Sequence, residues 1–184
     1  MDQKKDKNYL IVETGCMRAD HTPPGSPLAL GDDGASTYIF DDFINYYDGE
    51  VLSVDIKQAN VDYANEHTSD RTNAYCMDSV EFLWDLDAKN KIDFLYLDSY
   101  DFEPTNPVPS QLHHIKELCA VMKNLKSGTI IVVDGRGANA KFLRDNFKRN
   151  WLYKYEEDQH IFYLNDPILG KYNKLQLKFY NGNI

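Results

Sequence analysis

Five short stretches with the character of strands, most of them apolar and each followed by a polar turn, set the strongest limit on what this chain can fold into. They are Tyr9 to Glu13, Val51 to Val54, Thr72 to Cys76, Ile92 to Leu97 and Thr129 to Val133. Short apolar runs bounded by turn signals are typical of buried strands, and helical patterns lie between them. Strands that alternate with helices form a doubly wound sheet. The sequence therefore predicts an α/β protein with a Rossmann-like, mostly parallel sheet.

The last part of this alternating region has the pattern of a β-hairpin. Trp151 to Tyr155 and His160 to Leu164 are expected to pair around Glu156 to Gln159 and to add an antiparallel edge to the sheet. A chain of 184 residues is long enough for one well-buried core. We expect a single domain over residues 1–184, with a charged leader at 1–8, a core at 9–164 and a polar-aromatic tail at 165–184.

Capping residues predict where several helices begin and end. A helical pattern follows Gly34 to Ser36 and stops at Asp48-Gly49. Asp78, with Glu81 three positions later, has the spacing of a capping box and is expected to head another helix. Ser110 is expected to cap the helix that follows the proline-containing loop after the fourth strand.

The first strand–turn–helix unit indicates the kind of ligand. A dinucleotide site would need G-x-G-x-x-G, so that backbone amides can approach a diphosphate. Here Gly15 is followed by Cys16 and Met17, and Asp32-Asp33 precedes the helix. Two carboxylates would repel a diphosphate, whereas a ligand with an ammonium and a sulfonium suits an acidic mouth. We therefore expect S-adenosylmethionine as cofactor, and a nicotinamide-dependent Rossmann enzyme is a disfavoured alternative.

Charge and cysteine content limit the partners and the compartment. The formal net charge of −9 argues against nucleic acid as a partner, because phosphate binding needs clustered Lys and Arg. No apolar stretch approaches the ~18 residues of a membrane span, and the polar start does not resemble a signal peptide, so no membrane partner is expected. Cys16, Cys76 and Cys119 are odd in number and widely spaced, which indicates reduced thiols and a cytoplasmic protein.

A series of motifs at the strand ends resembles the class I S-adenosylmethionine-dependent methyltransferases. The motifs are Glu13-Thr-Gly15, Val54-Asp55, Cys76-Met-Asp78-Ser79, Leu97-Asp98-Ser-Tyr100 and Val133-Asp134-Gly135. Over Tyr9 to Leu164 they look most like the small-molecule O-methyltransferase and cephalosporin-hydroxylase-like branch. The resemblance implies a seven-stranded sheet with an antiparallel seventh strand and the cofactor at the carboxyl ends of strands one to four. The first motif departs from the family, because its second and third glycines are displaced to Gly31 and Gly34.

The resemblance also implies which residues bind the cofactor. Asp55 would accept the ribose hydroxyls, and Asp78 with Ser79 would contact adenine. Glu13 and Gly15 would lie near the methionine amino group. Structural alternatives stay open, since Asp55 and Asp78 can each cap the turn or helix that follows, and Gly15 can relieve a tight turn. The full expected set is Glu13, Gly15, Gly34, Ser36, Thr37, Asp55, Ile56, Asp78, Ser79, Asp98 and Tyr100.

Asp98 and Asp134 end strands that are neighbours in the expected order 3-2-1-4-5, about 4.8 Å apart. Two carboxylates there repel each other unless a positive charge lies between them. A divalent metal, Arg136 or the cofactor's own charge would supply it, and two solvated carboxylates are the alternative. The resemblance includes magnesium-dependent O-methyltransferases with acidic ligands at these strand ends. Asp98 and Asp134 are therefore the candidate ligands for Mg²⁺.

Asp98 is also the first candidate for a catalytic general base, which would take the proton of an acceptor hydroxyl. His113 is the second, because the pKa of histidine lies near working pH. Only one of the consecutive His113 and His114 can face the site from a helix. A surface or partly packed histidine is the structural alternative.

These features predict an S-adenosylmethionine-dependent methyltransferase that methylates the oxygen of a small-molecule or sugar hydroxyl. A non-catalytic methyltransferase-like binding module is the main alternative. Strand one begins almost at once, without a helical lid before it. The walls around a small-molecule acceptor are therefore expected to come from loops, from the tail or from another subunit, and a homodimer is one arrangement that this allows.

Overall fold

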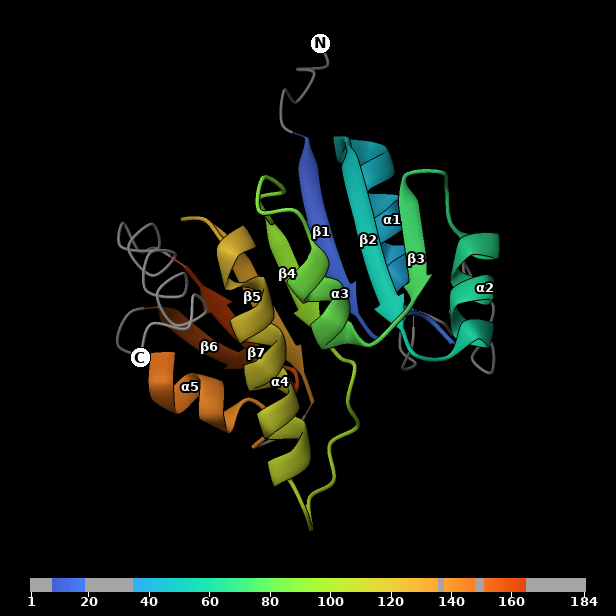
Figure 1. Ribbon diagram of the computed structural model, residues 1–184. Helices are drawn as coiled ribbons and strands as arrows, with labels where there is room; N and C mark the ends of the chain where they lie inside the picture. Colours follow the sequence, from blue (N-terminus) through green and yellow to red (C-terminus); the bar gives the residue numbers. More distant parts are fainter. Residues whose placement is uncertain (1–7, 19–34, 136–137, 148–150, 165–184) are drawn as a thin grey trace, which may run out of the picture.

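Seven strands and five α-helices alternate along the described part of the chain, which in this computed structural model is residues 8–18, 35–135, 138–147 and 151–164. The strands are β1 (Tyr9–Thr14), β2 (Gly49–Asp55), β3 (Thr72–Cys76), β4 (Phe94–Leu97), β5 (Ile130–Asp134), β6 (Leu152–Glu156) and β7 (Gln159–Tyr163). The helices are α1 (Ser36–Tyr47), α2 (Gln58–His67), α3 (Ser79–Asp85), α4 (Val108–Val121) and α5 (Lys141–Phe147), with a 3-10 turn, η2 (Met122–Asn124). The strands form one sheet in the order β3-β2-β1-β4-β5-β7-β6 (Figure 1).

The first five strands are parallel and confirm the predicted order 3-2-1-4-5. Thr14 at the end of β1 pairs with Val54 of β2 and with Leu97 of β4. Leu97 in turn pairs with Val133 of β5. This register brings the carboxyl ends of β1, β2, β4 and β5 to one edge of the sheet, where the predicted site residues lie.

The predicted hairpin is present, and β7 is antiparallel to both of its neighbours. Glu157 and Asp158 connect the two strands with positive φ angles of 47° and 62°. Positive φ at both central residues is the signature of a type I′ turn, which matches the twist of the flanking strands. β7 lies inside the sheet between β5 and β6, so the edge strand is β6. The expected antiparallel last strand is confirmed.

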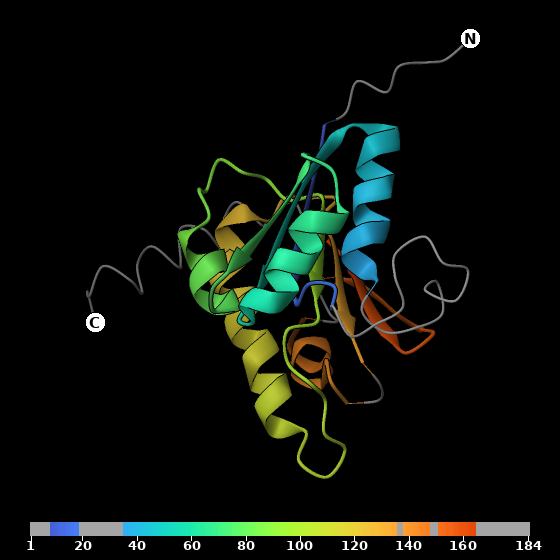
Figure 2. The ribbon, with the colours of Figure 1, turned by 90° about the vertical axis from the view of Figure 1, so that its right-hand side faces the viewer.

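Helices cover both faces of the sheet. Figure 2 shows α1 on one side and α3 and α4 on the other. The larger core cluster includes Leu83 of α3, Leu118 of α4 and Leu143 of α5, packed with inward side chains of the central strands. On the opposite face, Ile44 of α1 packs against Ile11 of β1 and its neighbours. Each face of the parallel strands is therefore buried, as a doubly wound sheet requires.

The predicted N-cap of α3 is confirmed, whereas the predicted N-cap of α4 is wrong. Asp78 is the N-cap of α3, and its Oδ1 accepts hydrogen bonds from the backbone N–H groups of Val80 (2.9 Å) and Glu81 (3.1 Å), which confirms the predicted cap. The prediction that Ser110 caps α4 is wrong, because the helix already begins at Val108. Proline is well suited to the first turn of a helix, and Pro109 lets the helix start earlier than the serine.

Some of the predicted features lie outside the described residues. They are most of the leader (1–7), Asp32, Asp33, Gly34, Arg136 and the tail at 165–184. The division into leader, core and tail stays a prediction. None of the helices in the described part of the chain is long and apolar enough to cross a membrane.

Candidate active site at the carboxyl ends of the strands

Gly15 joins three strand ends and has no room for a side chain. Its φ angle is +84°, and a Cβ atom placed on it would lie 2.3 Å from the carbonyl oxygen of Asp98. The backbone N–H of Gly15 donates to the carbonyl of Val54 (2.8 Å), and the N–H of Asp98 donates to the carbonyl of Thr14 (2.9 Å). The loop after β1 therefore lies directly against the residue that follows β4, and only glycine allows this approach.

Glu13 is fully buried, and its carboxylate is surrounded by hydroxyl groups. Ser36 donates to Oε1 at 2.5 Å, and Thr37 and Ser53 each donate to Oε2 at 2.6 Å. Thr37 also accepts a hydrogen bond from the backbone N–H of Met17 (2.8 Å). Burial raises the pKa of Glu13 to about 7, although the hydroxyl donors oppose this shift. Glu13 thus ties the start of α1 and the loop after β1 to the sheet.

Asp98 is the most perturbed carboxyl group at this edge of the sheet. Burial, followed by repulsion from Asp134 and Glu13, raises its pKa to about 8, and the positive charge of Arg18 partly opposes the shift. A group whose pKa lies so near neutrality can take up and release a proton under working conditions. Perturbed carboxyls of this kind are concentrated at functional sites.

Asp134 is held in place by two donors. The hydroxyl of Tyr96 donates to its Oδ1 at 2.8 Å, and the side-chain amide of Gln159 donates to the same oxygen at 3.3 Å. Burial and the nearby charge of Asp134 raise the pKa of Tyr96, so this tyrosine acts as a hydrogen-bond donor. Glu13 lies on β1 and Asp134 on β5, and Asp98 follows β4, the strand between them; we call these three carboxyl groups the acidic cluster, because the charges of Glu13 and Asp134 both act on Asp98.

The described residues do not provide a complete metal site. Among them, no group of three or more His, Cys, Asp or Glu side chains is arranged to hold a metal ion. Asp98 and Asp134 supply two carboxylates, and one oxygen of Asp134 already accepts two hydrogen bonds. The magnesium site stays a prediction.

The end of β2 presents a carboxylate followed by an exposed apolar side chain. Asp55 accepts hydrogen bonds from the backbone N–H of Lys57 (2.7 Å) and from the amide of Asn60 (3.0 Å), so it caps the turn into α2. Each of its oxygens keeps a second lone pair, so this role is compatible with ribose binding. The apolar side chain of Ile56, next to it, is 71% exposed beside the strand end. The predicted roles of both residues stay predictions.

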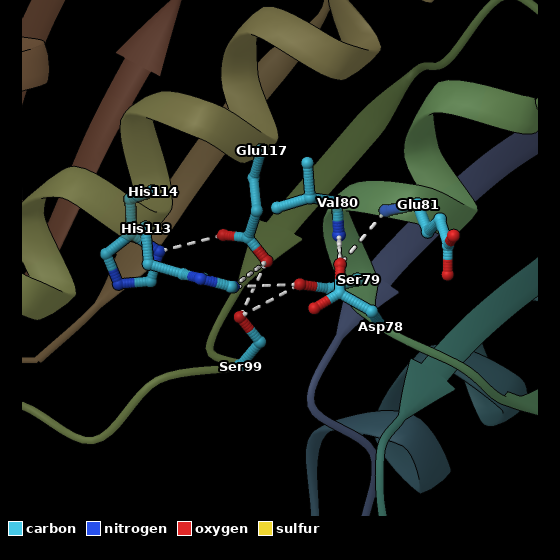
Figure 3. A network of polar contacts seen from close by, with 8 residues as sticks. All are labelled: Asp78, Ser79, Val80, Glu81, Ser99, His113, His114 and Glu117. Atoms are coloured by element: carbon cyan, nitrogen blue, oxygen red, sulfur yellow. Dashed lines mark hydrogen bonds and ion pairs between the residues drawn. The ribbon is translucent and has the colours of Figure 1, made fainter.

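Ser79 begins a buried polar network on the α3–α4 side of the sheet (Figure 3). Its Oγ lies 2.9 Å from Nε2 of His113 and 3.4 Å from Oγ of Ser99. Ser99 donates to Oε1 of Glu117 at 2.6 Å, and Nδ1 of His114 lies 2.9 Å from the other oxygen. We call Ser79, Ser99, His113, His114 and Glu117 the histidine network.

Asp98 and His113, the two predicted catalytic residues, belong to different groups. Asp98 is coupled to the acidic cluster, whereas His113 is hydrogen-bonded within the histidine network and its ring packs against that of Tyr100, with centroids 5.2 Å apart. The hydrogen bond to Glu117 raises the pKa of His113 above its ordinary value, although burial opposes this.

Several residues of the site were not predicted from the sequence. Tyr96 and Gln159 contact Asp134 from distant positions along the chain, Ser99 contacts Ser79, and Glu117 contacts His113 on its own helix. Glu117 had a local signal, because it is four residues after His113 and three after His114, and such spacings bring side chains together on a helix. The role of Tyr96 had none, since it depends on pairing between β4 and β5.

Comparison with solved structures identifies the fold. No family model and no curated protein matches the sequence. The structure matches that of the MycE methyltransferase of mycinamycin biosynthesis, solved with Mg and SAH, with a TM-score of 0.62 at 13% identity, over 98% of this chain and 52% of MycE. The chain has the Rossmann-like methyltransferase fold. In another crystal form of MycE the match covers 43% of that chain, so this chain spans about half of MycE.

Two further methyltransferases share this fold. CalS11, a TDP-rhamnose 3′-O-methyltransferase of calicheamicin biosynthesis, matches with a TM-score of 0.56 at 16% identity, over 88% of this chain and 74% of CalS11. The N-methyltransferase NodS from Bradyrhizobium japonicum WM9 matches with a TM-score of 0.50 at 10% identity, over 84% of each chain. In the methyltransferase fold, the acidic cluster and Gly15 of this chain lie at the carboxyl ends of the strands, where ligands bind in open α/β sheets.

Proposed function

We propose that this chain is an S-adenosylmethionine-dependent methyltransferase that methylates a hydroxyl group of a small molecule such as a sugar. The observation that carries the proposal is the position of Asp98. Asp98 directly follows β4, its backbone contacts the Gly15 turn, and the pKa of its carboxyl group is raised to about 8. The methyltransferase fold supports the cofactor, and the O-methyltransferase CalS11 supports an oxygen acceptor.

The residues at the ends of β1, β2 and β3 suit the cofactor. Asp55 would accept the ribose hydroxyls, while Ile56 and Asp78 would border the adenine. The negative charges at this edge favour a ligand that carries an ammonium and a sulfonium. The bound cofactor supplies a methyl group that is already activated by its sulfonium. The protein has mainly to hold the acceptor close to it and to exclude water.

Asp98 would act as the base that takes the hydroxyl proton of the acceptor. Its raised pKa matches this role, because a general base works best when its pKa is near the operating pH. Asp134, held by Tyr96 and Gln159, keeps a second negative charge nearby and so maintains the proton affinity of Asp98. Ionised Asp98 would take the hydroxyl proton as the acceptor oxygen bonds to the methyl carbon and the carbon–sulfur bond breaks to leave S-adenosylhomocysteine, and Asp98 would then release the proton to solvent.

Calorimetry followed by a transfer assay tests the proposal. We expect S-adenosylmethionine and S-adenosylhomocysteine (SAH) to bind the wild-type chain, measured with and without Mg²⁺. Asp98→Asn should keep SAH binding within a few-fold and lower methyl transfer to a panel of nucleotide sugars about 100-fold or more. The exposed Asp85→Asn serves as the matched control. Absence of binding to the wild type would contradict the cofactor assignment, and full transfer by Asp98→Asn would contradict its role as base.

A homodimer and a cytoplasmic location stay predictions from the sequence. Sedimentation of the purified chain would test the first.

A further inference from the structure

Glu117, a buried glutamate, connects two loops of the candidate active site. Glu117 lies on α4 and its side chain has no exposed surface. Its Oε1 accepts the hydrogen bond of Ser99 (2.6 Å) and lies 3.5 Å from Nε2 of His113, while its Oε2 lies 2.9 Å from Nδ1 of His114. Figure 3 shows the carboxylate between the two histidines and the two serines.

The contacts of Glu117 reach the loops that follow β3 and β4, through Ser99 directly and through His113 on α4. Ser99 directly follows Asp98, the proposed base. His113 reaches Ser79, which directly follows Asp78 at the start of α3, and the two serine hydroxyls are 3.4 Å apart. The loop proposed to border the adenine and the loop that carries the base are therefore joined through one carboxylate.

A charged group at this position is not needed for packing alone. A buried carboxylate is costly unless it is paired, and an apolar side chain of similar size often stabilises a core as well or better. Burial alone would raise the pKa of Glu117, but the hydrogen bonds from His113 and His114 and their charges lower it well below its ordinary range. The carboxylate thus stays ionised, and the two histidines and Ser99 are held by that charge.

We propose that Glu117 is a positioning residue of the cofactor site. It acts through His113, Ser79 and Ser99 and holds the loops after β3 and β4 in fixed positions relative to each other. This inference rests on the proposed function. Ser79 has its hydroxyl turned toward α4, so the residue left to face the cofactor is Asp78, whose place depends on the network.

His113 is the residue of the histidine network whose protonation we expect to change with pH. It faces Glu117, His114 and Lys116 from its own helix, Asp78 from the turn before α3, and the ring of Tyr100 from the loop after β4. Protonated His113 pairs with Glu117 and can donate to Ser79. Because its protonated form is favoured, the network is strongest at acidic to neutral pH and weakens as pH rises through the pKa of His113.

The test compares Glu117→Gln with Glu66→Gln, which removes the same charge from an exposed position on α2. Glutamine keeps the shape and can still accept from Ser99, but it cannot hold a charged histidine. SAH binding is measured by calorimetry between about pH 6 and 9, and the histidine Cε1–H resonances are titrated by NMR without ligand. Ser79→Ala is the second variant, since it cuts the link to α3 and leaves the Glu117–histidine pairs intact.

We expect Glu117→Gln to lower the NMR pKa of His113 and to weaken SAH binding about tenfold near neutral pH, with a flatter pH profile. Ser79→Ala should weaken binding about threefold or more, and Glu66→Gln should behave as wild type. Unchanged SAH affinity and pH profile in both Glu117→Gln and Ser79→Ala would overturn the positioning role. If the wild type itself binds no SAH, the proposed function fails instead, so the two failures are distinct.

Discussion

Individual carboxyl groups near the carboxyl ends of the strands have pKa values that differ strongly from their ordinary values. Glu13 and Asp98 are carboxyl groups whose pKa values are raised, to about 7 and about 8, chiefly by burial. Glu117 is the opposite case, since its histidine partners lower its pKa. Of these three carboxyl groups, Glu117 is stabilised as an anion, and Glu13 and Asp98 hold protons more tightly than free carboxyls do. Such opposed environments separate structural from reactive groups.

Asp98→Asn should make the protein more stable at alkaline pH. The pKa of Asp98 rises from 3.8 to about 8 on folding, so the folded state binds its proton more tightly than the unfolded state. The free energy of unfolding of the wild type therefore falls as pH rises from about 4 to about 8. Asparagine removes this term, and we expect a gain of about 1–3 kcal/mol at pH 8 and little change at pH 4. Urea unfolding of both proteins at pH 4 and pH 8 measures this difference in stability. An equal gain at both pH values would contradict the raised pKa of Asp98 as its cause.

Gly15→Ala should destabilise the protein far more than Gly128→Ala. Both glycines have positive φ angles, +84° and +91°, but a Cβ on Gly128 would meet no atom within 4 Å. The control therefore carries only the backbone cost, about 1–2 kcal/mol. A Cβ on Gly15 would lie 2.3 Å from the carbonyl oxygen of Asp98, so we expect a total loss of about 3–5 kcal/mol. Thermal unfolding of the two variants gives the difference, and equal losses would show that the backbone at Gly15 can move aside.

At the scale of elements, α3 and α4 act together as a support for the site. α3 has only seven residues, and such short helices depend on caps and packing. Asp78 caps its first turn, and Ser79 links it to α4 through His113. The predicted start of α4 is too late, because Pro109 favours a first turn that begins before Ser110. The predicted start of α3 is correct, because the capping box at Asp78 is a local signal in the sequence.

Replacing Asp78 separates its structural role from its binding role. Asp78→Ala removes the hydrogen bonds to the N–H groups of Val80 and Glu81 and should lower the free energy of unfolding by about 1 kcal/mol. Asp78→Asn keeps a good cap and should leave stability nearly unchanged. If Asp78 borders the cofactor, the asparagine variant should still bind SAH more weakly than the wild type, by calorimetry. Wild-type affinity in Asp78→Asn would leave only the capping role.

At the scale of the whole molecule, parallel strands explain why distant residues meet. Four strand ends from residues 14 to 134 lie at one edge because β1, β2, β4 and β5 run in the same direction and in register. The polar residues that meet there belong to two separate groups. Glu13, Asp98 and Asp134 form the acidic cluster, and Ser79, Ser99, His113, His114 and Glu117 form the histidine network beside α4.

The sequence by itself determined the α/β class, the hairpin and the acidic strand ends, because apolar periodicity, turns and caps are local signals, whereas the expected strand order came from the resemblance to the methyltransferases. Only the tertiary structure decided that Tyr96 holds Asp134, that Glu13 is surrounded by three hydroxyls, and that His113 turns to Glu117 and not to Asp98. Those contacts depend on strand register and on how α4 packs on the sheet. Burial and long-range pairing, which no local pattern encodes, also set the pKa values on which the proposed chemistry rests.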